Sequence, residues 1–214
     1  MKVALIGASG FVGSQVLKEA LQRGHWVTAI VRNPQKITTL DAKLTVQKAD
    51  VRNVEELAVL LKGHDAVISA YNAGWQNPNI YEDFIAASKD IQEAAKKAGV
   101  SRLLVVGGAG SLEAAPGMQL VDTPQFPAEW KKGALAARDY LNILKNEQEL
   151  EWTFLSPAIN LHPGTRVGVY RTGTDQPVFD AAGKCEISVE DLAVALVDEL
   201  ENKRFIRKRF TVGY

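Results

Sequence analysis

The feature that most constrains the fold is a glycine-rich segment, GASGFVG, at residues 7–13, which directly follows the apolar run VALI. Its glycines have the spacing G-x-x-G-x-x-G, and the amphipathic segment that comes next ends at Gly24. A glycine turn between a strand and a helix lets the backbone come close to a phosphate group, and the helix N-terminus offers N–H groups and a partial positive charge. Because this turn opens a chain of alternating strand-like and helix-like segments, we interpret it as a dinucleotide pyrophosphate site rather than a purely structural turn.

Further apolar runs recur along the chain, separated by segments of helical periodicity; they read WVTAIV, LTVQKA, AVISA, LLVVGG and WTFLSP. Runs that are apolar on consecutive residues are typical of strands covered on both faces, so we expect an α/β fold with a parallel sheet between two helical layers. We expect one domain over residues 1–214. Two stretches rich in glycine and proline, about 107–127 and 157–185, follow predicted strands and are expected to form substrate-side loops at the carboxyl edge of the sheet.

Several helix ends are marked by their residues. Gly24 stands where a left-handed cap would end the first helix. Asn53 with Glu56, and Ser188 with Asp191, have the spacing of a capping box and predict two helix starts.

The charge balance and the cysteine content limit the function classes. Lys+Arg and Asp+Glu are both 25, so no basic field is available for nucleic acid or for an anionic membrane surface. The single cysteine, Cys185, excludes an internal disulfide, and no apolar stretch has the length of a membrane span, so we expect a soluble, cytoplasmic protein. One cysteine and three scattered histidines give no metal-ligand spacing, and the oligomeric state is left open. The basic segment NKRFIRKRF, residues 202–210, is interpreted as the solvated face of an edge strand.

The end of the second predicted strand indicates which dinucleotide binds. NAD-binding proteins place a carboxylate there to hold the ribose hydroxyls, whereas this chain offers Arg32, Asn33 and Lys36. A guanidinium can bind a 2′-phosphate with two hydrogen bonds, so we expect NADP(H) to be preferred over NAD(H). The alternative is that Arg32 is an ordinary exposed residue in a turn before Pro34.

Two later strand ends are expected to complete the cofactor site. Asp50 and Val51 follow the third strand and would border the adenine, with a turn before a helix as the alternative for Asp50. The segment SAYN, residues 69–72, follows the fourth strand and would border the ribose and the pyrophosphate, with an ordinary loop as the alternative for Asn72.

These segments, together with GHDAVISA, EWTFLSPA and ISVEDLAVALVDELEN, resemble the atypical short-chain dehydrogenase/reductase family over nearly the whole chain. The likeness is to its NAD(P)H-binding group, which includes biliverdin reductase B-like flavin reductases and NmrA-like regulators and often carries the label NAD-dependent epimerase/dehydratase. The resemblance implies a Rossmann-type, doubly wound sheet of strand order 3-2-1-4-5-6 with a short extra strand. It implies cofactor contacts at Gly7, Ser9, Gly10, Phe11, Val12, Arg32, Asp50, Val51, Ser69, Ala70, Tyr71 and Asn72.

The catalytic pair of this family is missing. Most members use a tyrosine and a lysine four residues apart on the helix after the fifth strand, where the lysine lowers the pKa of the tyrosine. The matching helix here, WKKGALAARDYLNILK, places Trp130 and Ala134 at those positions. Tyr140 and Lys145 do not replace the pair, because a spacing of five residues puts them roughly 140° apart on the helix, and we expect Tyr140 to pack with its hydroxyl in water.

Few residues remain as candidates for catalysis or acceptor binding. Ser111, just past the fifth strand, and His162, past the sixth, could act near the nicotinamide, although both residues are common in turns. Trp75 and Trp130 could stack on a planar substrate, although an aromatic residue in a loop also serves to fill that loop's own small core.

Three functions are compatible with this pattern. The leading hypothesis is an NADPH-dependent reductase that transfers hydride directly to a conjugated acceptor such as a flavin, a quinone or a tetrapyrrole, since such an acceptor needs orientation more than acid–base groups. A second is a non-enzymatic NADP(H) sensor that docks a protein partner. A third, a sugar-nucleotide epimerase or dehydratase, fits the residues poorly because that chemistry uses the tyrosine and the lysine.

Overall fold

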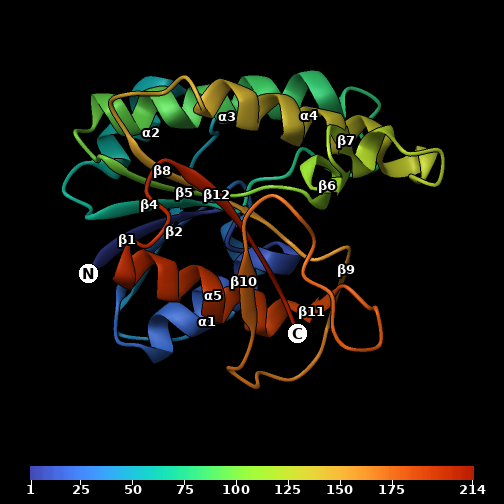
Figure 1. Cartoon of the computed structure of the whole chain (residues 1–214). Coiled ribbons are helices and arrows are strands. Elements are labelled where there is room, and N and C mark those ends of the chain that lie inside the picture. Colours follow the sequence, from blue (N-terminus) through green and yellow to red (C-terminus); the bar gives the residue numbers. More distant parts are fainter.

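The computed structural model describes residues 1–214 and is built on one eight-stranded sheet, in the order β10-β12-β8-β5-β4-β1-β2-β3 (Figure 1). Every neighbouring pair is parallel except β10 with β12. The six strands expected from sequence are β1 (Lys2–Ile6), β2 (Trp26–Val31), β3 (Leu44–Lys48), β4 (Ala66–Ser69), β5 (Arg102–Val106) and β8 (Glu151–Ser156). Their order confirms the predicted 3-2-1-4-5-6 arrangement of a Rossmann-type sheet.

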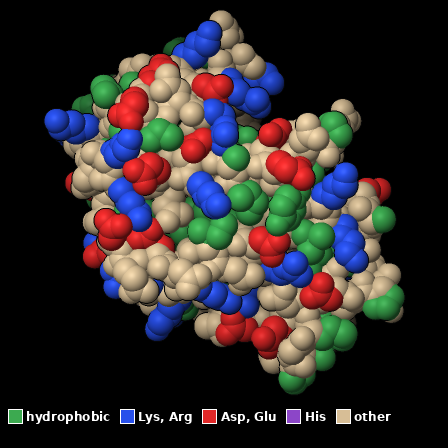
Figure 2. Space-filling view, turned by 90° about the horizontal axis from the view of Figure 1, so that it is seen from above, with side chains coloured by type: hydrophobic (Ala, Val, Ile, Leu, Met, Phe, Trp, Pro, Cys, Tyr) green, Lys and Arg blue, Asp and Glu red, His purple; other side chains and the backbone are tan.

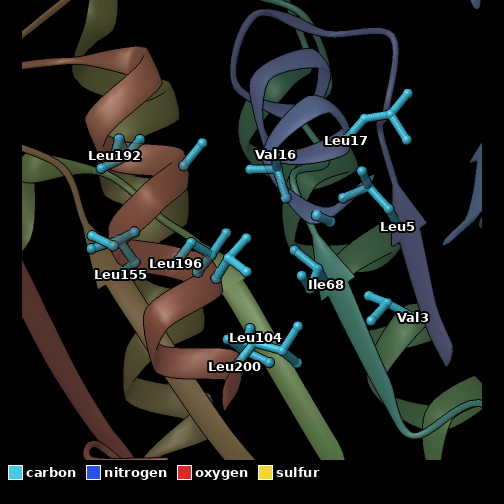
Figure 3. Packing of buried hydrophobic residues seen from close by; sticks show 14 of the residues in the cluster. Val3, Leu5, Val16, Leu17, Ile68, Leu104, Leu155, Leu192, Leu196 and Leu200 are labelled. Atoms are coloured by element: carbon cyan, nitrogen blue, oxygen red, sulfur yellow. The ribbon is translucent and has the colours of Figure 1, made fainter. Parts of the chain in front are cut away.

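Helices cover both faces of the sheet, so the strands are apolar on consecutive residues (Figure 1). One face carries α1 (Phe11–Gln22) and α5 (Val189–Asn202); the other carries α2 (Val54–Leu61), α3 (Ile80–Lys97) and α4 (Ala128–Leu144). Each face buries a cluster of 25 residues. Figure 3 shows the first cluster, in which leucines of α5 and the pair Val16 and Leu17 of α1 cover Leu5, Ile68, Leu104 and Leu155 of the sheet.

The helix ends follow the predicted signals. Gly24 has a φ of 82°, the left-handed conformation expected of the cap after α1. The side chain of Asn53 accepts from the backbone N–H of Glu56, and that of Ser188 accepts from the N–H of Asp191.

None of the five helices combines the length and the apolar composition needed to cross a bilayer.

The C-terminal strand corrects one expectation. β12 (Lys208–Gly213) is not an edge strand, because β8 pairs with it on one side and β10 (Arg171–Gly173) on the other. Arg209 and Phe210 are buried rather than solvated, but β10 pairs only with residues 211–213, so their burial comes from side-chain contacts: Phe210 lies in the core under α1 and α5, and Arg209 contacts Ser111 and Asp175. The covering strand β10 belongs to the 157–185 segment, whose sequence predicts a loop and gives no strand-like apolar run there.

Both predicted substrate-side segments lie at the carboxyl edge of the sheet and contain short elements (Figure 1). The first holds the 3-10 turn η2 (Ala109–Ser111), the hairpin of β6 (Glu113–Ala115) and β7 (Met118–Gln119), and the 3-10 turn η3 (Leu120–Asp122). The second holds β9 (Asn160–His162), which pairs with β11 (Glu186–Ser188), and β10. Figure 2 shows basic and acidic side chains intermixed over the face that carries α2, α3 and α4.

Candidate functional site

The glycine turn between β1 and α1 is a tightly packed backbone feature. Gly7 has a φ of 80°, and a methyl group on it would lie 2.5 Å from the backbone oxygen of Ala70. A methyl group on Gly13 would lie 2.1 Å from the backbone oxygen of Gly7, so only glycine lets α1 pack this close to the turn. Gly10 begins α1 without a side-chain cap, and the first turn carries no acidic residue. The helix therefore presents its N-terminal N–H groups and partial positive charge without a carboxylate of its own.

A cleft of about 170 Å³ lies beside this turn, where four segments meet at the carboxyl ends of β1, β2, β3 and β4. Residues predicted to bind the cofactor line it: Gly7, Ser9, Gly10, Arg32, Asn33, Lys36, Val51, Ala70, Tyr71 and Asn72. Sequence reasoning missed four more lining residues, namely Ile6, Ile30, Val31 and Ala49. Each lies at or just past the end of a predicted strand, which is the signal that could have identified it.

Four predicted cofactor residues lie outside the lining of the cleft. Phe11 is half exposed at the start of α1, and Val12 packs against the core under α1 and α5. Ser69 is buried within β4. The Asp50 carboxylate accepts from the backbone N–H of Arg52 at 3.0 Å, which is the helix-preceding turn that the sequence left as the alternative.

The cleft carries unpaired positive charge. Arg32 lies just before the 3-10 turn η1 (Pro34–Lys36), and Lys36 is the last residue of that turn. Both side chains are exposed, and neither has a carboxylate within 4.0 Å. Burial raises the pKa of Tyr71 above its ordinary value, and this effect outweighs the opposing charge of Arg32. The phenol therefore keeps its proton at neutral pH. The Asn72 side chain accepts from the N–H of Gly74 at 2.7 Å, so its oxygen shapes the loop.

At the other end of the carboxyl edge lies Ala134, the residue that the family resemblance aligns with the catalytic lysine. Ala134 is buried in α4, and a methyl group on Gly110 of η2 would lie only 2.9 Å from the Ala134 Cβ. η2 thus lies directly against the helix at this position. Position 134 therefore offers no amine, and its side chain is buried against η2.

The remaining tyrosine of α4 does not supply a proton either. Tyr140 is 1 % exposed, and its hydroxyl donates to Oε1 of Gln92 at 3.3 Å. Burial raises the pKa of Tyr140 far above its ordinary value. The expectation of a hydroxyl in water is wrong, because α3 covers this face of α4.

Two indoles flank the start of α4. Trp75, from the loop after β4, packs against Gly133, where a methyl group would lie 2.7 Å from the Trp75 Cζ3. Trp130 lies three residues before Gly133 and hence on a similar side of the helix. Both indoles are exposed, Trp75 by 58 % and Trp130 by 50 %, so each has a free surface for a flat ligand.

The structure places neither catalytic candidate in the cleft. Ser111 is 1 % exposed, and its hydroxyl and backbone oxygen accept from Nη1 of Arg209 at 3.3 and 3.2 Å, so an exposed hydroxyl near the nicotinamide is not observed. The Nδ1 atom of His162 lies 3.0 Å from the backbone oxygen of the next residue, Pro163, a local contact typical of a turn. It lines a separate, larger hollow of about 580 Å³, with Tyr170, Arg171 and Tyr214 among the other lining residues. No group of three or more His, Cys, Asp or Glu side chains is arranged to hold a metal ion.

Comparisons with known proteins agree with this geometry. The Bacillus subtilis protein YwnB is 41% identical over 99% of this chain and 98% of its own length. A crystal structure of a proposed epimerase from Bacteroides thetaiotaomicron has a TM-score of 0.93 at 49% identity, and covers 100% of this chain and 96% of that one. A proposed NADH-flavin reductase from Streptococcus pneumoniae has a TM-score of 0.86 at 37% identity, over 100% and 99% of the two chains. Residues 7–203 match the model of the NAD(P)H-binding family, and the chain belongs to that family.

Proposed function

We propose that this protein is an NADPH-dependent reductase that transfers hydride to a flat, conjugated acceptor such as a flavin, a quinone or a tetrapyrrole. The observation that carries the proposal is the close contact of η2 with Ala134, the residue that the family resemblance aligns with the catalytic lysine, in a chain that also has a family-typical dinucleotide cleft. NADPH supplies the hydride when it is bound.

An acceptor of this kind matches a site without an acid. Hydride addition to a ketone produces an alkoxide that requires a nearby proton donor. Hydride addition to a flavin or a quinone spreads the negative charge over the ring system, and water supplies the proton, so orientation is the main requirement. Trp75 and Trp130 would supply orientation by stacking on the ring.

We propose that Arg32 and Lys36 bind the 2′-phosphate of NADPH. Both side chains are exposed at the cleft and lack a carboxylate partner within the protein, so their charge is available to an anionic ligand. The Streptococcus pneumoniae relative is named for NADH. The proposal for this chain rests on Arg32 and Lys36 and not on that name.

The direct test is turnover by the purified protein. NADPH oxidation should require an added flavin, quinone or tetrapyrrole, such as FMN, riboflavin, a simple quinone or biliverdin, and should saturate with the acceptor. If none of these acceptors raises NADPH oxidation above the rate without protein, the reductase proposal is wrong.

A non-enzymatic NADP(H) sensor is the second candidate, favoured by the burial of Ser111 and the absence of the catalytic pair. A sensor should bind NADP⁺ and NADPH with different affinities and show negligible turnover. The epimerase named for the Bacteroides relative is the weakest candidate here, because its chemistry uses a tyrosine and a lysine that are Trp130 and Ala134 in this chain.

A further inference from the structure

Arg209 is a buried cation that the proposed reaction does not yet use. It lies in β12 opposite Phe154 of β8, with a side chain 6 % exposed. Its neighbour Phe210 belongs to the core under α1 and α5. Because side chains alternate along a strand, Arg209 faces the other side of the sheet, where α4 and η2 lie.

The Arg209 guanidinium joins both substrate-side segments. Nη1 donates to the backbone oxygen and the hydroxyl of Ser111 in η2, at 3.2 and 3.3 Å. Nε and Nη2 both donate to Oδ1 of Asp175, which follows β10, and the Nε distance is 3.2 Å. A further hydrogen bond, from the N–H of Glu113 to the backbone oxygen of Asp175 at 2.8 Å, links the same two segments directly.

The burial of the two charges is unequal. The Asp175 side chain is 63 % exposed in a surface loop, whereas the Arg209 side chain is almost completely buried in β12. The ion pair therefore attaches the surface loop to the sheet. The hydroxyls of Ser156 and Thr211, which are paired residues of β8 and β12, are also buried on this part of the sheet, but they have no protein partner. Unlike these two hydroxyls, the Arg209 guanidinium is charged and donates hydrogen bonds to both substrate-side segments.

The position of η2 bears on the proposed chemistry. η2 follows β5 at the carboxyl edge and lies against Ala134, one turn of α4 from Trp130. A shift of η2 would alter the wall next to the place where a flat acceptor would stack, without touching the glycine turn or Arg32. Cofactor binding and acceptor binding should therefore respond differently to the loss of Arg209.

We infer that Arg209 is a positioning residue for the electron acceptor, which it serves by holding η2 and the loop of Asp175 together over the end of the sheet. The inference rests on the proposed reductase function. It assigns no chemical step to Arg209, which acts through Ser111 and Asp175.

The test compares three variants with a matched control. Arg209→Met removes the guanidinium N–H donors and keeps an unbranched side chain. Arg209→Lys keeps the charge but loses the forked guanidinium that reaches both loops. Asp175→Asn removes the negative charge of the partner. Asp180→Asn is the control, since it makes the same change in the same loop at a residue whose carboxylate accepts only from N–H groups of its own turn. Hydrogen exchange of peptides 109–113 and 174–177 is measured with acceptor kinetics and NADPH affinity.

Arg209→Met should speed exchange in both peptides and lower kcat/KM for the acceptor by about tenfold to 100-fold, with the Kd for NADPH within about twofold of the parent. Arg209→Lys should recover part of the loss, and Asp180→Asn should show no change. Unchanged exchange in either peptide, or equal losses in acceptor kinetics and NADPH affinity, overturns the inference. If the parent protein reduces no acceptor, the proposed function fails and so does the acceptor role of Arg209, while the exchange data still decide whether Arg209 couples the two loops.

Discussion

Replacement of Arg32 by glutamine should weaken NADPH binding selectively. Arg32 is exposed and has no carboxylate partner, so its removal leaves no buried charge behind and the loss comes from the ligand contact alone. A hydrogen bond to a charged group contributes about 1.5–3 kcal/mol, and screening by salt at this exposed position favours the lower part of that range. We therefore expect the Kd for NADPH to rise by about tenfold to thirtyfold.

The assay is a titration of NADPH and NADH into the parent and the variant at two salt concentrations. The Kd for NADH should stay within about twofold, because NADH lacks the 2′-phosphate, and Arg32→Asp should reverse the preference between the two. Arg52→Gln is the matched control, since Arg52 is also exposed but pairs with Asp90 at 2.7 Å and does not line the cleft. Equal loss of affinity for both dinucleotides, or no loss at all, would refute the assigned role of Arg32.

The remaining predictions concern packing and pH. Gly13→Ala should lower the free energy of unfolding by about 1–3 kcal/mol in chemical denaturation and abolish dinucleotide binding, because its methyl group would lie 2.1 Å from the Gly7 oxygen; a stable variant that binds normally contradicts the packing argument. Ala134→Lys should destabilise the protein by a similar ~1–3 kcal/mol, because η2 packs against residue 134. For the same reason, the double variant with Trp130→Tyr should not reduce ketones, and a gain of ketone reduction would show that η2 moves aside. Burial of Glu147 opposes its ionisation, but hydrogen bonds from Lys96, from Gln92 and from the N–H groups of Glu149 and Leu150 together lower its pKa to about 2. Stability from Glu147 is therefore full above the ordinary carboxyl pKa of 4.5 and is lost as the pH falls toward 2, so Glu147→Gln should flatten the acid limb of a stability–pH curve, and an unchanged acid limb contradicts this.

The parts of the molecule that sequence predicts well are those set by local patterns. The positions of the six expected strands follow from apolar runs, and the cap at Gly24 and the tight turn at Gly7 follow from the placement of glycines, all of which act over short stretches of chain. The order of those strands in the sheet was expected from the family resemblance and not from these local patterns. Most of the cleft was predictable for the same reason, since strand ends in this fold converge on the glycine turn.

The burial of Ser111, Tyr140 and Arg209 was not predicted, because it depends on contacts between distant segments. The buried hydroxyl of Ser111 finds its partner in Arg209, 98 residues later in the chain, and Arg209 in turn pairs with Asp175, which follows the three-residue strand β10. The burial of Tyr140 depends on Gln92 in another helix, 48 residues away. Side-chain periodicity in one segment carries no information on such partners.

The central claim is hydride transfer from NADPH to a conjugated acceptor without an acid from the protein. The most direct measurement is the single-turnover rate of flavin reduction, with NADPH deuterated in turn at each of the two C4 positions, as a function of pH. If the protein supplies no acid, one of the two deuterated forms should react more slowly and the rate should be flat across neutral pH. A rate of flavin reduction that follows the titration of a protein acid, or the absence of NADPH oxidation with every conjugated acceptor, would contradict hydride transfer without an acid from the protein.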